Sequence, residues 1–496
     1  MPPAVPGPDL PERSGRLSDT DGAPGPDGTD GHDDTNDDGH GAPRASWEDA
    51  YYRNLAARRT NPLSRAVGSW AQRLQDAAAD GSFESQQPRY ASGMTKRDYV
   101  LNTLGNATWG MVFPLLTIVA TRLVGAADAG VFSLAFVTAT LLMYVGDWGT
   151  RTFQVADRRD VRSFADYRAA RLVSVAVMLA VGIAWHVLRG ESPETLVMGI
   201  AVLAYRAQDS LADVFEGRLQ QSDKTYLAGA SQALRSAAAL VLFSVVLLVS
   251  RNLAAASVAL FVGALFVFVV FTVPMAALET PRPRKLDLAN VIEILRVTSP
   301  MCAAFVLYNL CDNCPKLCMD GVLSPDNQLF FNAIYFPAHS ILMMARMVYG
   351  PLIGTLADSR SGGDGSGGPK GSFSRLVAAI FACIVGLVAV MLVAMNTVGI
   401  PLMTFMYGID FAGLRAAICL MIVAGGLTAS TDFLYQVLTI ERRQRMATPL
   451  YALTFVVSLV CSLVLIRLFA LMGAVAAYVA SMVFLFALLV WRTAVR

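Results

Sequence analysis

The sequence predicts an all-α polytopic membrane protein with about twelve transmembrane helices. Apolar runs of about 20 residues recur from residue 99 onward, and this length matches the thickness of a bilayer. Residues 99–496 hold only 29 basic and 22 acidic side chains, about half the charged fraction of a soluble protein. These observations exclude a soluble enzyme. The seven cysteines are too few, and too often inside apolar runs, for a secreted disulfide scaffold.

The first 95 residues are predicted to form an acidic cytoplasmic tail. Residues 1–45 carry a net charge of −7 and many Pro and Gly residues, so they cannot bury enough apolar surface to become ordered. Near 61–79, Asn61 and Pro62 are typical of a helix start, and apolar residues follow at helical spacing. This segment is predicted to be either an amphipathic helix on anionic lipid or a partly ordered linker helix.

Twelve apolar segments follow the tail, and each is long enough to span a membrane as a helix. They lie near residues 99–122, 130–150, 168–188, 195–215, 226–249, 254–277, 297–318, 328–352, 373–396, 411–438, 447–467 and 471–491. The loops on one side carry 19 Lys and Arg residues and those on the other carry four. Because basic loops stay in the cytoplasm, both termini are predicted to be cytoplasmic and the protein is assigned to the plasma membrane.

The connecting loops are too short to fold into an enzyme domain. The longest, residues 353–374, is rich in glycine, but Pro369 precedes Lys370 and no strand comes before the loop. It therefore differs from a phosphate-binding loop and is predicted to be a flexible linker. The sequence predicts no enzymatic activity and no cofactor.

Charged residues lie inside several predicted spans. Arg206, Asp209 and Asp213 in the fourth span share one helix face with Glu216 and Gln220, because they are three or four residues apart. The three inner charges would cost roughly 8–10 kcal/mol if they faced lipid, so this face must contact other helices or water. The other deep or semi-deep polar residues are Asn102, Asn106, Arg235, Asn309, Asp312, Lys316, Arg346 and Asp432.

Two interpretations of these charges remain open. In the first, a hydrated cavity binds a polar or anionic substrate, and arginines bind its phosphate groups. The cavity candidates are Arg206, Asp209, Arg235, Asn309, Asp312 and Arg346. Candidates for a coupling proton or sodium ion are Asp209, Asp213 and Asp312. In the second interpretation, Arg206 pairs with Asp209 and Asp312 pairs with Lys316 within their own helices, and residues near span ends reach the interface.

Cysteine and histidine patterns predict no metal site. Cys311, Cys314 and Cys318, with Cys302 nearby, could be compared with iron–sulfur ligands. They fall inside an apolar span rather than in a loop, which favours packing between helices. The four histidines are scattered.

Three passages carry a resemblance to a known family. The first two spans read YVLNTLGNATWGMVFPLLTIVATRLVGAADAGVFSLAFVTATLLMYVGDWGTRTFQV, with Gly125 and Gly130 near an external turn. The seventh and eighth, with Ser299-Pro300 and FFNAIYFPAHSILMMARMVYGPL, look like a divergent second copy. The last two are in ERRQRMATPLYALTFVVSLVCSLVLIRLFALMGAVAAYVASMVF, with Gly473 at their turn. Residues 97–496 thus resemble the polysaccharide flippases of the multidrug/oligosaccharidyl-lipid/polysaccharide (MOP) export superfamily.

This resemblance implies two six-helix lobes, 97–279 and 286–496, around a central cavity and joined by the basic loop 280–286. The lobes would open alternately to either side of the membrane. The implied cargo is an oligosaccharide linked to a polyprenyl diphosphate, moved to the outer leaflet for cell-surface polysaccharide synthesis. Implied partners are this glycan, membrane lipids and, as further candidates, a glycan polymerase and glycosyltransferases, but no nucleic acid.

Three alternatives remain. A cation-coupled multidrug antiporter of the same superfamily would favour buried carboxylates, and both carboxylates and arginines occur here. The lipid II flippase branch usually has two more spans, for which this sequence has no candidates. A scaffold of a glycan-synthesis complex would use the acidic tail as a docking arm.

Overall fold

The computed structural model describes residues 88–157, 161–280, 285–350, 372–440 and 447–494, together with Leu352, Ile353 and Leu356. Side chains are described from Arg97 onward. All of these residues belong to one compact unit, Tyr51–Arg496. The predicted tail up to residue 87, with its segment near 61–79, lies outside the described residues, as does most of the glycine-rich loop.

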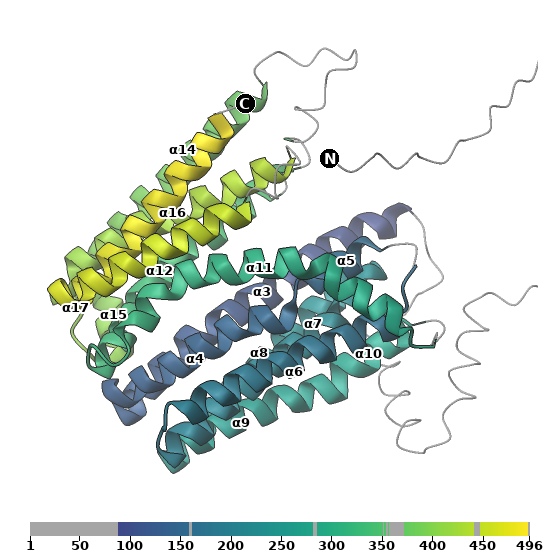
Figure 1. Cartoon of the computed structure of the whole chain (residues 1–496), viewed down its shortest axis with the longest axis horizontal. Coiled ribbons are helices and arrows are strands. Elements are labelled where there is room, and N and C mark those ends of the chain that lie inside the picture. The colour runs from purple at the N-terminus through teal and green to yellow at the C-terminus, as the bar shows by residue number, and fades with distance from the viewer. Residues whose placement is uncertain are drawn as a thin grey trace, which may run out of the picture. The chain divides into compact units, whose positions relative to one another are not determined.

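Within the described ranges the chain is helical and contains no strand (Figure 1). The first helices are α3 (Pro88–Val124), α4 (Ala126–Asp147), α5 (Thr150–Ala156), α6 (Phe164–Leu188), α7 (Pro193–Gln221), α8 (Thr225–Ser250), α9 (Leu253–Val267) and α10 (Val273–Leu278). They are followed by α11 (Leu288–Met319), α12 (Pro325–Tyr349), α14 (Ser372–Ala394), α15 (Ile400–Tyr407), α16 (Arg415–Ile440) and α17 (Ala447–Ala494). We call α3–α10 the N-terminal half and α11–α17 the C-terminal half.

The prediction of about twelve spanning helices is confirmed. In the described part of the chain, nine helical stretches are long and apolar enough to cross a membrane. The last of these, α17, contains two predicted spans, which are separated by the non-helical backbone of Ala470 (φ 50°). Helices α7 and α12 contain more polar residues but are 29 and 25 residues long. One π-helical turn joins α9 to α10 and another joins α14 to α15.

The helix ends differ from the predicted span ends where charged residues occur. Helix α7 continues to Gln221 and α11 begins at Leu288, beyond the predicted limits of 215 and 297. Hydropathy treats charged residues as loop, yet Glu216 and Arg218 are buried in α7 because they have polar partners. The short helix α5, which follows Gly149 (φ 69°), was not predicted.

Close glycine contacts let some helices pack backbone to backbone. A Cβ atom on Gly105 of α3 would lie 2.5 Å from the carbonyl oxygen of Gly229 of α8, and a Cβ on Gly229 would lie 2.3 Å from that of Leu101. Such contacts are typical of helices in membranes, where small residues allow close approach. Within the N-terminal half, α7 also packs against α4, α6 and α9, and within the C-terminal half α11 and α16 pack against α17.

Helix α4 contacts the C-terminal half through both α11 and α12. At the end predicted to be external, a Cβ on Gly130 would lie 2.0 Å from the carbonyl oxygen of Pro325, and Arg189 forms an ion pair with Asp320. At the end predicted to be cytoplasmic, Trp148 Nε1 donates to the Leu295 carbonyl at 2.9 Å.

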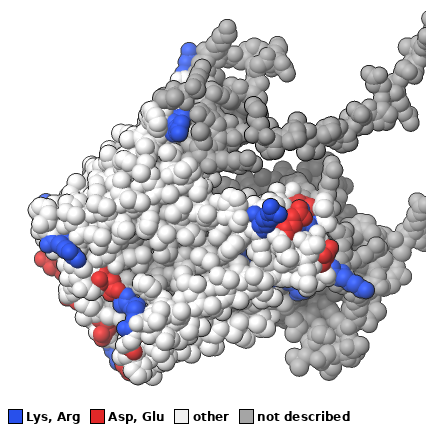
Figure 2. Space-filling model, viewed as in Figure 1, with Lys and Arg blue, Asp and Glu red and all other residues white. Residues whose placement is uncertain are grey.

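The surface of the described helices suits a lipid environment. Figure 2 shows a broad face without charged side chains, and the charged groups gather toward the helix ends. Large apolar side chains such as Phe266, Val245 and Val390 are exposed along the helices. A helix satisfies its backbone groups by internal hydrogen bonds, so helices whose apolar side chains face outward are suited to lipid.

Candidate functional site

The polar face of α7 points into the N-terminal half. Ser192 caps the start of α7, and its side chain accepts a hydrogen bond from the Thr195 backbone N–H. Pro193 follows in the first turn. Both residue types are favourable at a helix start. From there the predicted three- and four-residue spacing places Arg206, Asp209 and Glu216 in the interior, where each is at most 6% exposed.

Eight charged side chains from five helices form a continuous series of ion pairs, which we call the charge chain. Its members alternate in sign in the order Arg206, Asp209, Arg235, Glu216, Arg151, Asp213, Arg171 and Asp147. The shortest contacts are Arg235 Nη1 to Glu216 Oε1 at 2.5 Å, and those of Arg151 Nη1 and Arg171 Nη2 to the two oxygens of Asp213, each at 2.6 Å. The predicted pair of Arg206 with Asp209 is present at 2.9 Å.

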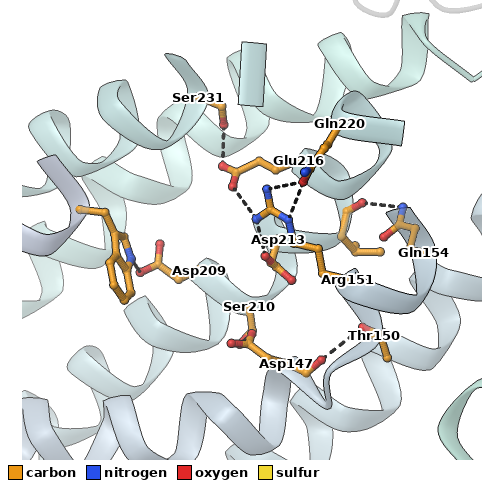
Figure 3. A network of polar contacts seen from close by, with 12 residues as sticks. Asp147, Thr150, Arg151, Gln154, Asp209, Ser210, Asp213, Glu216, Gln220 and Ser231 are labelled. Carbon is orange, nitrogen blue, oxygen red and sulfur yellow. Dashed lines mark hydrogen bonds and ion pairs between the residues drawn. The ribbon is translucent and has the colours of Figure 1, made fainter. Parts of the chain in front are cut away.

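Neutral groups complete the charge chain. Trp109 Nε1 donates to Asp209 at 3.2 Å, Ser231 donates to Glu216 at 3.0 Å, and Ser210 donates to Asp147 at 2.7 Å. Figure 3 shows Arg151 reaching toward Asp213, Glu216 and Gln220. Because buried charges are stable only when paired and hydrogen-bonded, this arrangement explains how α7 can hold four charges. The four arginines balance the four carboxylates.

A second polar cluster lies in the C-terminal half around Asp312. Its carboxylate accepts hydrogen bonds from the hydroxyls of Tyr335 at 2.6 Å and Tyr478 at 2.8 Å. The second interpretation predicted a pairing of Asp312 with Lys316, but the structure has these tyrosine contacts in its place. Lys316 Nζ instead donates to Asn313 at 2.9 Å and lies 3.7 Å from the ring centre of Tyr335.

Asn309 and Arg346 are more accessible than the other predicted cavity candidates, which are all buried. Asn309 is half-buried and donates to the carbonyl oxygen of Phe305 at 2.8 Å. Arg346 binds Asp432 in a bidentate manner, with Nε at 3.1 Å and Nη2 at 2.7 Å from the carboxylate oxygens. The Arg346 side chain is 55% exposed, whereas those of Arg206 and Arg235 are 4% and 3% exposed.

Tyr144 lies where α4 meets the C-terminal half. This residue is half-buried, and its carbonyl oxygen accepts a weak hydrogen bond from Cys302 Sγ of α11 at 3.9 Å. Sequence reasoning did not single out Tyr144. Nor did it single out Tyr335 and Tyr478, because a tyrosine inside an apolar run looks like an ordinary core residue. Nothing in the sequence points to them, because they reach Asp312 from two other helices, α12 and α17.

A cavity of about 360 Å³ lies at the end predicted to be external. Its lining includes Trp185, His186, Arg189, Asp320 and Gln328, and none of the predicted site residues. Where the structure describes the chain, no three His, Cys, Asp or Glu side chains are grouped as metal ligands. Within this part, Cys314 and Cys318 lie 3.9 Å apart at their sulfurs as free thiols.

Comparisons with known proteins give a family and a fold. A family model described as "Polysaccharide biosynthesis protein" matches residues 98–357. An inward-facing multidrug resistance MATE family transporter of the MOP superfamily is 12% identical, with a TM-score of 0.58 over 77% of this chain and 93% of that one. A mutant of the Vibrio cholerae MATE transporter VcmN is 12% identical, with a TM-score of 0.55 over 80% and 95%. No curated protein matches significantly.

A MOP superfamily transporter from Pyrococcus furiosus, described as having a binding pocket of reverse polarity, is also similar. It is 12% identical, with a TM-score of 0.50 over 80% of this chain and 95% of that one. At this level of identity the likeness to the solved structures concerns the fold alone.

Proposed function

Because the chain belongs to the polysaccharide biosynthesis protein family and has the fold of MOP-superfamily transporters, we propose that it flips a lipid-linked glycan. The substrate would be an oligosaccharide on a polyprenyl diphosphate, moved from the cytoplasmic to the outer leaflet of the plasma membrane. The resemblance found in the sequence is confirmed by family and fold. The proposal rests on the family match over residues 98–357 together with the accessible guanidinium group of Arg346.

The two halves are proposed to act as rocking lobes, 97–279 and 286–496, with the substrate passing between them. The basic loop 280–286, which connects the two lobes in the sequence, supports this division. Contacts such as Arg189 with Asp320 and Gly130 with Pro325 join the halves at the predicted external end. Contacts such as Trp148 with Leu295 and Arg162 with Glu293 join them at the predicted cytoplasmic end.

Arg346 is the best candidate for binding the diphosphate. A guanidinium group binds phosphate oxygens in a fork-like geometry, and the half-exposed side chain of Arg346 is accessible. Asn309 and Tyr335, which are both half-buried, supply amide and aromatic groups suited to sugars. Arg206, Asp209 and Arg235 could join the site only if the charge chain rearranged, because each is paired in this conformation.

Energy coupling by a proton or sodium ion at Asp209, Asp213 or Asp312 remains a proposal. Each carboxylate already accepts hydrogen bonds from arginine, tryptophan or tyrosine, so a coupling ion would have to displace a donor. Replacing Asp312 by Asn keeps a hydrogen-bond acceptor and removes the charge.

Reconstitution in liposomes tests the function directly. A fluorescent polyprenyl-diphosphate sugar placed in one leaflet should appear in the other when the protein is present. Arg346→Gln should slow this transfer about tenfold or more, since a charge-assisted hydrogen bond to phosphate is lost. Arg375→Gln, which removes an exposed charge near the start of α14, is the matched control and should transfer at the wild-type rate. Transfer unaffected by Arg346→Gln would contradict the assignment.

A cation-coupled multidrug antiporter is the second candidate, favoured by the buried carboxylate of Asp312 and the MATE-like fold. The same liposomes, loaded with a cationic dye and given a proton or sodium gradient, discriminate between the two. Gradient-driven dye export without lipid transfer would replace the flippase proposal.

A further inference from the structure

The contact between Arg346 and Asp432 uses only one edge of the guanidinium group. Nε and Nη2 face the carboxylate, while Nη1 donates to no group in the described part of the chain. Tyr349 also donates to Asp432, so the carboxylate is held from two positions of α12. Because a guanidinium carries five N–H donors in a fixed plane, its second edge, formed by Nη1 and Nη2, remains available to another anion.

A second unused donor is provided by α11. The hydroxyl of Tyr308 is buried and has no hydrogen-bond partner among the described residues. Its ring packs against that of Tyr451 at 5.4 Å between centroids, and Tyr451 lies 6.3 Å from the ring of Tyr435, three residues after Asp432 on α16. A buried hydroxyl without a partner is costly, so this hydroxyl is a donor that a ligand could satisfy.

We propose that the open edge of Arg346 and the hydroxyl of Tyr308 bind the diphosphate of the substrate, and that Asp432 limits the strength of this binding. Asp432 is then a positioning residue. It orients the guanidinium and neutralises its charge when the site is empty. This proposal rests on the proposed flippase function and names a residue in the C-terminal half for the substrate's charged group.

Asp432 is expected to weaken diphosphate binding because its carboxylate is negatively charged. A paired Arg346 and Asp432 have no net charge, so a diphosphate is attracted mainly by directed hydrogen bonds. An arginine without its carboxylate would hold the anion more tightly, because the repulsion by Asp432 would be absent and this repulsion is strong at low dielectric. A transporter must release its substrate, and a carboxylate that remains bound to the arginine favours release.

Calorimetric titration of the full-length protein in detergent with inorganic pyrophosphate tests the proposal. Asp432→Asn should bind pyrophosphate about tenfold more tightly, because the repelling charge is gone while an acceptor for Arg346 remains. Tyr308→Phe should bind several-fold more weakly, and Arg346→Gln should not bind measurably. The control is Glu279→Gln, which removes the carboxylate of the Lys224 pair within the N-terminal half and should leave affinity unchanged.

A purely structural role for Asp432 predicts the opposite result. Asp432→Asn would then lower or preserve the affinity, and either outcome overturns the proposal. Thermal unfolding of each variant identifies loss of folding, and Arg346→Lys serves as a second variant if Arg346→Gln does not fold. Lysine keeps the charge but lacks the second edge, so it should bind pyrophosphate more weakly than the wild type; equal affinity would also count against the site.

Competition experiments distinguish a lipid-linked diphosphate from a soluble nucleotide as the ligand. Farnesyl diphosphate should displace pyrophosphate at lower concentration than uridine diphosphate does, and the reverse order would contradict a lipid-linked ligand. The liposome assay separates this inference from the proposed function. If wild-type protein flips the lipid but Asp432→Asn shows no gain in affinity, only the inference fails. If the gain appears but no lipid crosses the bilayer, only the proposed function fails.

Discussion

At the scale of single residues, three arginines that look equivalent in the sequence occupy different environments. Arg206 and Arg235 lie in the charge chain, whereas Arg346 is more than half exposed beside Asp432. Spacing along α7 was sufficient to predict that its polar residues share one face. The spacing could not predict that Arg151 and Arg171 pair with Asp213, because these arginines come from other helices and their positions depend on tertiary packing.

The charge chain makes Arg235 a stabilising residue. Arg235→Gln would leave Asp209 and Glu216 without this shared cation, and removing one member of a buried pair costs about 3–5 kcal/mol. The unfolding midpoint of the purified protein in detergent should therefore fall strongly. Arg346→Gln makes the same substitution at a half-exposed pair and should lower the midpoint much less. Equal shifts for the two variants would refute the distinction between them.

At the scale of helices, hydropathy predicted which segments cross the membrane but not where their polar ends stop. The ends of α7 and α11 extend past the predicted limits, because charged residues there are satisfied by neighbours that the sequence does not reveal. The tyrosines around Asp312 were missed for a related reason: their hydroxyls become visible as donors only when α11, α12 and α17 are placed together.

The contact of α3 with α8 gives a prediction for glycine. Gly229→Ala should destabilise the protein, because the new Cβ would meet the backbone of Leu101 and Asn102 at less than 3 Å and the helices would have to separate. Gly386→Ala in α14 is the control, since no atom lies within 4 Å of its Cβ position. Alanine there should preserve stability or raise it by up to about 1 kcal/mol. The comparison uses thermal unfolding in detergent, and a neutral effect of Gly229→Ala would contradict the described packing.

At the scale of the whole transporter, the two halves meet mainly through α4 with α11 and α12, and also through α6 with α11 and α3 with α15. The sequence predicted the number of spans and, by resemblance, two lobes; it could not predict which residues connect them. Arg189 and Asp320 are far apart in the chain and have ordinary surface character, yet they form an ion pair between the halves. In the proposed cycle this contact must open for the substrate to leave.

The most direct measurement of the proposed cycle is lipid transfer by protein whose halves are covalently joined at that contact. Arg189→Cys with Asp320→Cys, treated with a short bifunctional thiol reagent that a reductant can cleave, would hold the predicted external ends together. The two variants that carry only one of these substitutions, treated in the same way, control for reaction at the seven native thiols. We expect transfer of the fluorescent polyprenyl-diphosphate sugar to stop after cross-linking and to resume after reduction. Transfer that continues at the wild-type rate in the cross-linked protein would contradict transport by alternating movement of the two halves.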